Sequence, residues 1–488
     1  MADIFLTNTL GKKKEKFVPI NSDKVGIYSC GPTVYRDIHI GNLRTYLSAD
    51  ILKRVLTYNG YKVYHVKNIT DVGHMRTDPA TSGPRGAGEE AAIDPIIDEA
   101  LKQGKTPQEV ASEYTKKFLD DEKVLNIIPA NVFPKATEHI SEMIELTKQL
   151  LEKGFAYETR GTIYFDVKRF ADYGKLSGNT LDKMDKLLGA VRVATETDKK
   201  DSIDFALWKK AQNDRSLKWD SPWGEGFPGW HIECSAMSLK YLTDAFKDGE
   251  FNHEQSRRID IHTGGEDNIF PHHEDEIAQS EAATGEKVVN YWLHAGFLLV
   301  DGKKMARREG NVYTVSDLVK KSFNPLAFRY LTLTTHYRSR LNFTWDSLKA
   351  AETALNNLYR ELTGYVTNGE VTSVNSDFEK KFVDAVNNDL DTPAALTLVW
   401  DLVRSNMPVG EKAATLYKFD EVLGLDLEKV AEEAAEVPEE VKKLIEQREE
   451  AWKKGDFSES DKLRNEIKGK GYEVVDTPEG QKLKKVVS

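Results

Sequence analysis

The chain has very few cysteines, two in 488 residues. So few cysteines point to a reducing compartment, where a metal-binding or catalytic role is favoured over one buried disulfide. The sequence also lacks any apolar run of about 18 residues, which a membrane-spanning helix requires. Its first residues, MADIFLTNTLGKKKEK, lack the apolar stretch of a signal peptide. We therefore expect a soluble, cytoplasmic protein that has no membrane partner.

A surplus of positive charge is absent as well. The formal net charge of −11 at pH 7 excludes a globally basic nucleic-acid binder. The segment from Glu439 to Ser488 has twelve basic and twelve acidic residues, so the excess of acidic residues lies elsewhere in the chain. Any contact with RNA must therefore be local. The length and the ordinary apolar and charged fractions predict roughly two to four globular domains.

The stretch from Gly265 to Ser280, GEDNIFPHHEDEIAQS, has the spacing of a metal-binding helix. His272 and Glu276 are four residues apart, so a helix places them on one face, one turn apart. Imidazole and carboxylate are both ligands for a divalent metal such as zinc. His273 and Glu274 are expected to point elsewhere. The alternative is a polar helix start with acidic residues near its positive end.

The two cysteines complete a plausible set of zinc ligands. Cys30 and Cys234 would add two thiolates to His272 and Glu276. The cysteines are separated by 203 residues, so their spacing is not that of a zinc finger and only the fold could bring them together. The alternative is that both are buried free cysteines that pack as small hydrophobic residues.

The segment after the N-terminal residues predicts a βαβ unit of a parallel sheet. Val25–Cys30 and Tyr61–Ile69 have the composition of strands, and the apolar residues between Asn42 and Tyr58 recur at helical spacing. Parallel sheets bind ligands beyond the C-terminal ends of their strands. His39 and Thr70 would lie at that edge, together with the first cysteine.

Two short segments could bind phosphate groups. In HIGN at His39, the helix N-terminus attracts phosphate, Gly41 allows close approach, and the imidazole can donate a hydrogen bond. The basic run that begins at Lys303, KKMARREGN, suits a loop that clamps a polyphosphate. The alternatives are a histidine in an ordinary loop and a solvated basic turn. Trp230, four residues before Cys234, could form the wall of a small pocket.

These motifs together resemble those of a known family. HIGN and KMARR are similar to the HIGH and KMSKS signatures of class I aminoacyl-tRNA synthetases. Further motifs resemble cysteinyl-tRNA synthetases specifically, and the match runs from near Phe5 to the C-terminal segment. These motifs are CGPTVY at Cys30, NIT at Asn68, GWHIECSAMS at Gly229, FPHHEDEIAQSEA at Phe270 and HYRS at His336.

The resemblance implies an α/β fold with a Rossmann-like, doubly wound parallel sheet. A connective-peptide insertion would split this sheet, and a helical bundle and a small C-terminal α+β segment would follow it. The expected boundaries are 1–106 and 205–318 for the two halves of the catalytic domain, 107–204 for the insertion, 319–430 for the helical domain that supports anticodon recognition, and 431–488 for a linker and a small tRNA-binding segment.

The resemblance also implies an activity, a metal and partners. A monomer would activate L-cysteine with ATP-Mg²⁺ and transfer it to the 3′ end of tRNA(Cys), releasing AMP and pyrophosphate. One zinc per chain, held by Cys30, Cys234, His272 and Glu276, would bind the thiolate of the substrate. Because a metal–thiolate bond separates cysteine from serine strongly, no separate editing domain is expected.

The resemblance assigns further roles by position. His39 would stabilise the α-phosphate, Gly41 would pack under the adenine, and Asp267 would hold the ribose. Lys304 and Arg307 would grip the departing pyrophosphate, and Asn42 completes the catalytic set. Residues expected to contact the amino acid or ATP also include Gly31, Thr33, Thr70 and Trp230.

The chain departs from the family pattern in three places. Asn42 stands where HIGH has its second histidine, and Arg307 and Arg308 replace the second lysine and the last serine of KMSKS. Residues 73–76, GHMR, replace an acidic run. Two other functions compete: a ligase that joins activated cysteine to an amino sugar, and a non-catalytic zinc-binding RNA regulator. The helical region and C-terminal segment argue against the first, and His39 and Lys304 against the second.

Overall fold

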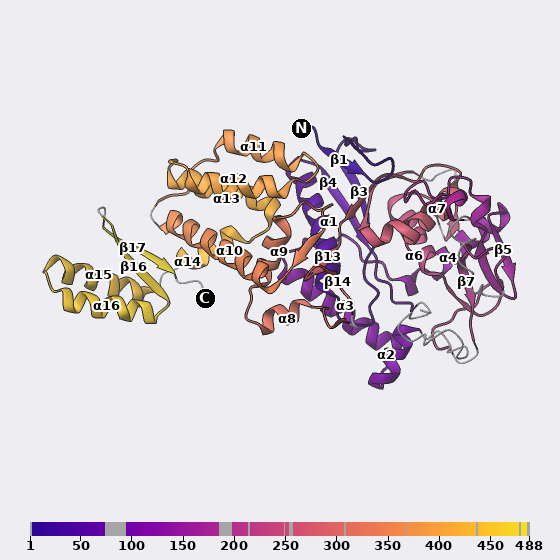
Figure 1. Cartoon of the computed structure of the whole chain (residues 1–488), viewed down its shortest axis with the longest axis horizontal. Helices are drawn as coiled ribbons and strands as arrows, with labels where there is room; N and C mark the ends of the chain where they lie inside the picture. Colours follow the sequence, from indigo (N-terminus) through magenta and orange to yellow (C-terminus); the bar gives the residue numbers. More distant parts are fainter. Residues whose placement is uncertain are drawn as a thin grey trace.

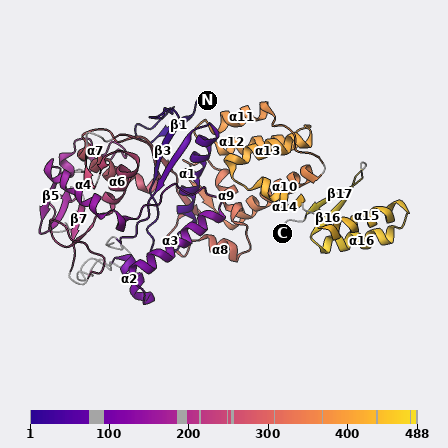
Figure 2. The same ribbon diagram turned by 180° about the vertical axis from the view of Figure 1, so that it is seen from behind.

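The computed structural model describes residues 2–73, 94–184, 198–212, 215–247, 249–252, 257–306, 309–367, 369–435, 438–477 and 480–485. Figure 1 shows an elongated molecule, with the insertion at one end, the catalytic sheet beside it, then the helical domain, and the C-terminal segment at the other end. The view from behind gives the same order (Figure 2). Within the described residues, no helix combines the length and the apolar character needed to cross a bilayer.

A parallel four-stranded sheet forms the centre of the catalytic domain. Its strands, in spatial order, are β12 (Val289–Ala295), β11 (Ile259–Gly265), β3 (Lys24–Ser29) and β4 (Lys62–Lys67). Helix α1 (Ile40–Tyr58) connects β3 to β4, and α7 (Glu274–Thr284) connects β11 to β12. The chain therefore winds in opposite directions from the β3–β11 junction, which confirms the predicted doubly wound sheet and makes this junction the expected ligand site.

Alternating side chains of the strands enter two different hydrophobic cores. Ile27 and Ile261 pack with α1 (Ile40–Tyr58) on one face of the sheet. Tyr28 points to the other face and packs there with α6 (Trp230–Leu242) and α7 (Glu274–Thr284). All residues of β11 are buried, as expected for a parallel strand covered on both faces.

The insertion combines helices with a second sheet, which is antiparallel. Its sheet has the order β5 (Ala156–Thr159), β6 (Thr162–Phe165), β7 (Phe205–Lys210) and β8 (Gly226–Pro228). The helices are α2 (Pro95–Gln103), α3 (Pro107–Val124) and α4 (Ile140–Glu152). The expected boundary at 204/205 falls between β6 and β7, which are hydrogen-bonded neighbours. We therefore propose that the insertion continues through β8.

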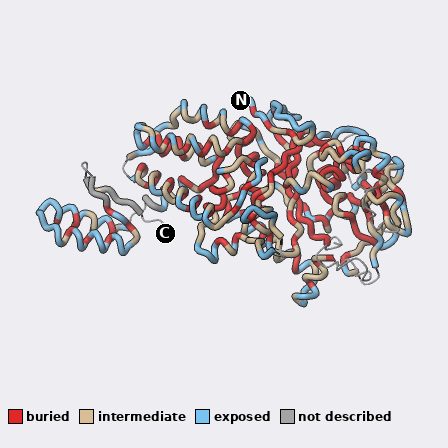
Figure 3. Tube along the Cα trace, viewed as in Figure 1, coloured by how far each residue is buried: buried red, intermediate tan, exposed pale blue. Residues whose placement is uncertain are grey.

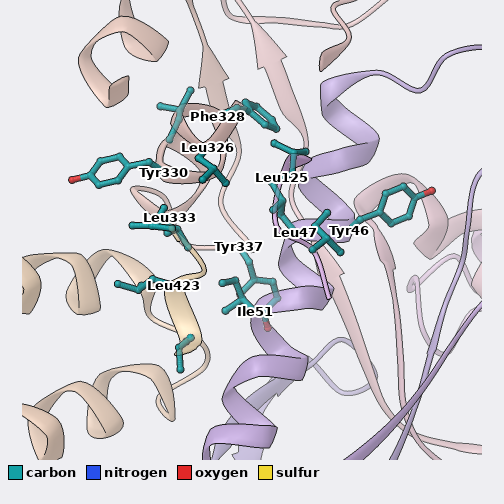
Figure 4. Packing of buried hydrophobic residues seen from close by; sticks show 14 of the residues in the cluster. Tyr46, Leu47, Ile51, Leu125, Leu326, Phe328, Tyr330, Leu333, Tyr337 and Leu423 are labelled. Carbon is teal, nitrogen blue, oxygen red and sulfur yellow. The ribbon is translucent and has the colours of Figure 1, made fainter. Parts of the chain in front are cut away.

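The helical domain packs directly on the catalytic domain. Helix α1 contacts α9 and α13, and their apolar side chains form one continuous core. Figure 4 shows Leu47 and Ile51 of α1 facing Leu326 and Leu333 of α9 and Leu423 of α13. The domain consists of α8 (Val315–Lys320), α9 (Pro325–Leu333), α10 (Trp345–Thr367), α11 (Ser376–Val386), α12 (Thr392–Arg404), α13 (Val409–Leu423) and α14 (Leu427–Ala435).

The C-terminal segment is a small unit with its own core. Helices α15 (Glu439–Lys453) and α16 (Phe457–Gly469) pack on the hairpin of β16 (Tyr472–Thr477) and β17 (Gly480–Lys485). Its hydrophobic core includes Val441, Ile467, Tyr472 and Val474. Figure 3 shows mostly exposed surface there, in contrast to the buried catalytic domain. A core this small contributes little stability by itself.

Candidate functional site

The four predicted metal ligands come together at the switch point of the sheet. Cys30 follows β3, Cys234 lies on α6, and His272 and Glu276 lie where a short π-helix (Ile269–His273) leads into α7. One ligand atom from each residue lies within 4.8 Å of those of the other three, and all four residues are buried. The Sγ atoms are 3.8 Å apart, and His272 Nε2 is 3.0 Å from Glu276 Oε1. The fold thus closes the 203-residue gap between the cysteines.

The electrostatics of this cluster favour a cation. A hydrogen bond from Cys30 lowers the pKa of Cys234 to about 7, whereas burial raises the pKa of Cys30. Burial opposes charge on His272, but the nearby Cys234 thiolate and Glu276 carboxylate raise its pKa to about 10. Burial likewise opposes charge on Glu276, yet His262 and His272 lower its pKa to about 2. Cys234 and Glu276 therefore lie as anions beside a protonated His272, whose proton a divalent cation would replace.

The donor set fits a zinc ion. Two thiolates, an imidazole and a carboxylate are all ligands of zinc, and four is its usual coordination number. The ligands also have outer partners of the kind that orient metal ligands: His262 Nε2 lies 2.9 Å from Glu276 Oε2, and His231 Nδ1 lies 2.8 Å from His272 Nδ1.

One expectation about neighbouring residues is wrong. His273 was expected to point elsewhere, but it is buried, with Nε2 3.2 Å from Cys30 Sγ and Nδ1 2.7 Å from His294 Nε2. The π-helical turn and the non-helical backbone of Phe270 rotate it toward the cluster, which regular helical spacing does not predict. Glu274 does point elsewhere, because it accepts hydrogen bonds from the backbone of residues 176–177.

A pocket of about 310 Å³ adjoins the cluster. Cys30 lines both, and the Trp230 ring lies in the pocket wall with its centroid 4.6 Å from that of His272. His39 caps α1, and its Nδ1 accepts a hydrogen bond of 3.2 Å from the Asn42 N–H. In the neutral ring, this hydrogen bond places the ring proton on Nε2. The α1 N-terminus faces this pocket and suits an anion.

Most predicted site residues line this pocket. The Met305 side chain covers Gly41, whose missing Cβ would lie 2.3 Å from the methionine methyl carbon. Gly31 has to be glycine, because a Cβ there would lie 1.6 Å from the Asn68 carbonyl oxygen. The predicted residues in the lining are Cys30, Gly31, Thr33, His39, Gly41, Asn42, Trp230, Asp267 and Lys304.

A few predicted residues lie outside the lining. Thr70 is buried behind it, with its backbone N–H donating to the Pro32 carbonyl, and pairs with Thr33 in an isolated parallel bridge. Arg307, Arg308 and residues 74–76 of the GHMR segment lie outside the described residues.

Sequence reasoning missed several residues of the pocket. Glu266, Phe297 and Met305 line it, although the sequence patterns assign none of them a role. A usable signal existed for Phe297, because it follows β12 directly and so lies at the ligand-binding edge of the sheet. Met305 lies inside the KMARR run, in which the pattern assigns roles only to the charged residues.

Comparisons with known proteins place the chain in a class and then in a family. The family model for the tRNA synthetases class I (C) catalytic domain matches residues 16–80 and 91–353. Solved structures agree in fold: methionyl-tRNA synthetase of Mycobacterium tuberculosis with methionyl-adenylate has a TM-score of 0.56 at 14% identity, covering 84% of this chain and 93% of that one. A leucyl-tRNA synthetase complex from Agrobacterium radiobacter K84 gives 0.57 at 12% identity, covering 86% and 85%. The fold is that of a class I aminoacyl-tRNA synthetase.

The curated relatives narrow the class. Cysteine--tRNA ligase 1 of Burkholderia lata is 44% identical, covering 98% of this chain and 96% of its own length. The cysteine--tRNA ligases of Thermus thermophilus and Thermococcus onnurineus are each 40% identical, with 98% of both chains covered. This chain belongs to the cysteine--tRNA ligase family.

Proposed function

We propose that this enzyme activates L-cysteine with ATP and transfers it to the 3′ end of tRNA(Cys). The carboxylate of cysteine attacks the α-phosphate of ATP and expels pyrophosphate, and a terminal ribose hydroxyl of the tRNA then attacks the adenylate and expels AMP. The observation that carries the proposal is the buried Cys30, Cys234, His272 and Glu276 cluster beside a pocket lined by His39 and Lys304. Catalysis needs no protein nucleophile and consists of positioning and charge stabilisation.

We assign zinc to the four-residue cluster. When bound, zinc would supply a bond to the thiolate of cysteine that the hydroxyl of serine does not match. Such a bond exceeds the ~1–3 kcal/mol available from one methylene group, so selection would not require an editing domain. In the adjoining wall, the Trp230 indole and the backbone around Gly31 would exclude larger side chains and water.

Different residues of the pocket would bind different parts of the ATP molecule. His39 Nε2–H and the α1 N-terminus would bind the α-phosphate, and Gly41 would leave room for the adenine once Met305 moves. Asp267, exposed at the end of β11, would accept hydrogen bonds from the ribose. Lys304 and Arg307 would hold the pyrophosphate. Asn42 orients His39 through its backbone rather than its side chain, so its departure from HIGH leaves this contact intact.

Replacing His39 with alanine should lower kcat for adenylate formation by about 100-fold, the loss typical of one donor to a developing charge. The KM for cysteine and the zinc content should stay unchanged, because His39 is not among the four clustered donors. Cysteine-dependent exchange of pyrophosphate into ATP measures the effect. Unchanged turnover would remove His39 from its assigned role.

The C-terminal segment offers a surface for tRNA. Trp452 and Phe457, at the end of α15 and the start of α16, are 51% and 63% exposed. Exposed aromatic rings stack on unpaired bases, and Lys453 and Lys454 between them would contact phosphates. Replacing both rings with alanine should raise the KM for tRNA at least about 10-fold, at ~1–3 kcal/mol per stacked base. Aminoacylation assays check this, and cysteine-dependent pyrophosphate exchange should not change.

The first experiment is aminoacylation of total tRNA with labelled cysteine, run beside labelled serine, with zinc assayed on the same sample. Charging by cysteine alone, with about one zinc per chain, supports the proposal. Activation of cysteine without charged tRNA would favour the amino-sugar ligase, and no activation would favour the RNA regulator. We also infer a cytoplasmic location from the two reduced cysteines that the site requires. The monomeric state stays a prediction, which sedimentation tests.

A further inference from the structure

The Phe297 ring lies between catalytic and helical parts of the chain and contacts two cations. Lys304 Nζ is 4.2 Å from the ring centroid, and the guanidinium carbon of Arg340 is 5.7 Å from it. Both distances fall within the range of cation–π attraction. Phe297 and Lys304 also line the pocket.

Strand pairing explains the contact with Lys304. Strand β13 (Leu298–Val300) pairs antiparallel with β14 (Lys303–Lys304), and Leu299 lies opposite Lys304. Phe297 comes two residues before Leu299, so its side chain is on the same face and is the diagonal neighbour of Lys304. The lysine backbone is thus held by the hairpin, and its long side chain extends along the ring.

The Phe297 backbone is fixed on several sides. Its N–H donates to Glu266 Oε2 at 3.2 Å, and its carbonyl accepts from Arg44 Nη1 at 2.6 Å and from the Leu341 N–H at 3.0 Å. Arg44 is buried and also donates to the Gly296 carbonyl at 2.6 Å. A side chain at position 296 would collide with the backbone of residues 338 and 339.

Arg340, which lies between α9 and α10 of the helical domain, connects this arrangement to that domain. Its guanidinium donates to both carboxylate oxygens of Glu266, at 2.7 and 3.3 Å, while Glu266 accepts from Phe297. The hydrogen bond from Arg340 lowers the pKa of Glu266, so the carboxylate is charged near neutral pH. The backbone of Tyr337 and Leu341 is hydrogen-bonded to Gly296 and Phe297, whereas the side chain of Arg340 reaches Phe297 and Glu266.

We propose that Phe297 is a positioning residue that holds the Lys304 ammonium at the pocket, with Arg340 and Glu266 holding Phe297 in turn. This inference rests on the proposed function, in which Lys304 binds the phosphates of ATP. A free lysine side chain would sample many rotamers, and the ring restricts it before ATP arrives. Phe297 touches Lys304 rather than the reacting atoms, so it acts through the lysine.

The contact is tested first without any substrate. Lysines of the full chain are dimethylated with ¹³C-formaldehyde, which keeps their charge, and the methyl signals are recorded by NMR. We expect one signal displaced upfield by the ring, which is absent from Lys304→Arg. In Phe297→Leu it should move to the position of exposed lysines, and in Phe297→Tyr it should remain. An undisplaced Lys304 signal in the unsubstituted protein would overturn the proposal.

Kinetics then test the role. Phe297→Leu should lower kcat/KM for ATP in cysteine-dependent pyrophosphate exchange by about two- to fivefold, the size of one exposed cation–π contact. Phe297→Tyr should keep the kcat/KM for ATP of the unsubstituted protein, and neither substitution should change the KM for cysteine. Arg340→Gln should act like Phe297→Leu. Arg338→Gln is the matched control, because Arg338 pairs with Asp389 instead.

A double substitution separates positioning from packing. In a Lys304→Met background, Phe297→Leu should have no further effect; a full additional loss would show that Phe297 acts on packing and would overturn the proposal. If the unsubstituted protein shows the displaced methyl signal but no cysteine-dependent exchange, the proposed function fails, and the positioning role fails with it.

Discussion

Replacing Cys234 with serine should abolish zinc binding and raise the KM for cysteine. Cys234 is 1% exposed, and its sulfur lies 3.8 Å from that of Cys30 within the four-donor cluster. A serine hydroxyl is protonated at neutral pH and is a poor substitute for a thiolate ligand. Because losing an outer partner already costs about 10–100-fold in metal affinity, losing a ligand should cost more. Metal analysis, the cobalt absorption spectrum and pyrophosphate exchange measure the outcome.

A matched control lies one turn along the same helix. Ser238 is buried on α6 and donates only to the carbonyl of Ser235, at 3.1 Å, so Ser238→Ala should keep zinc and the KM for cysteine. Comparing the thermal midpoints of both variants separates loss of metal from loss of fold. A Cys234→Ser protein with one zinc per chain and an unchanged KM would contradict the ligand assignment.

The cluster illustrates what the sequence could predict about the site. The spacing of His272 and Glu276 indicated a shared helical face, and their ligand atoms do approach to 3.0 Å. The cysteines were included because thiolates are zinc ligands, but no local spacing relates positions 30 and 234, so two buried free cysteines stayed possible until the resemblance matched both to zinc ligands. The approach of His273 to Cys30 could not be predicted, since it depends on a local π-helical turn rather than on α-helical geometry.

The fold could be predicted where the apolar residues of a single segment recur at the period of a helix or a strand. The expected helix at 42–58 corresponds to α1, and Val25–Cys30 corresponds to β3, because apolar residues recur there at regular intervals. The end of the insertion was harder to predict from the sequence. Strand β7 belongs to it because it pairs with β6, which lies 40 residues earlier in the chain, and no local pattern shows this pairing. The placement of Phe297 beside Lys304 likewise depends on a hairpin register that no motif encodes.

Replacing Arg329 with methionine should destabilise the junction between the domains by about 3–5 kcal/mol, the usual cost of breaking a buried ion pair from one side. Arg329 of α9 is 0% exposed, and its Nη2 lies 2.6 Å from Asp50 Oδ2 of α1. It also donates to the carbonyls of Leu125, at 3.0 Å, and Leu423, at 2.6 Å. One side chain thus joins α1 of the catalytic domain, the insertion and the helical domain; the side chains of Leu125 and Leu423 are labelled in Figure 4.

The effect should depend on pH in a defined direction. Burial alone would raise the pKa of Asp50, but Arg329 and Arg54 outweigh burial and lower it. A carboxyl with a lowered pKa stabilises the fold above its unfolded pKa of about 3.9, and this contribution is lost as the pH falls through the folded value. The difference in urea midpoint between the unsubstituted protein and Arg329→Met should therefore be largest at pH 7 and should shrink below about pH 4.

Arg404→Met is the control, because Arg404 is an arginine of the same domain with a side chain that is 70% exposed. Its partner among the described residues is Asp401, at 3.6 Å. An exposed pair contributes about 0–1 kcal/mol, so this variant should unfold at nearly the original urea concentration. Equal midpoints for the two variants would refute the role of Arg329. A larger shift for Arg329→Met than for Arg404→Met would support the role of this buried ion pair in joining the domains.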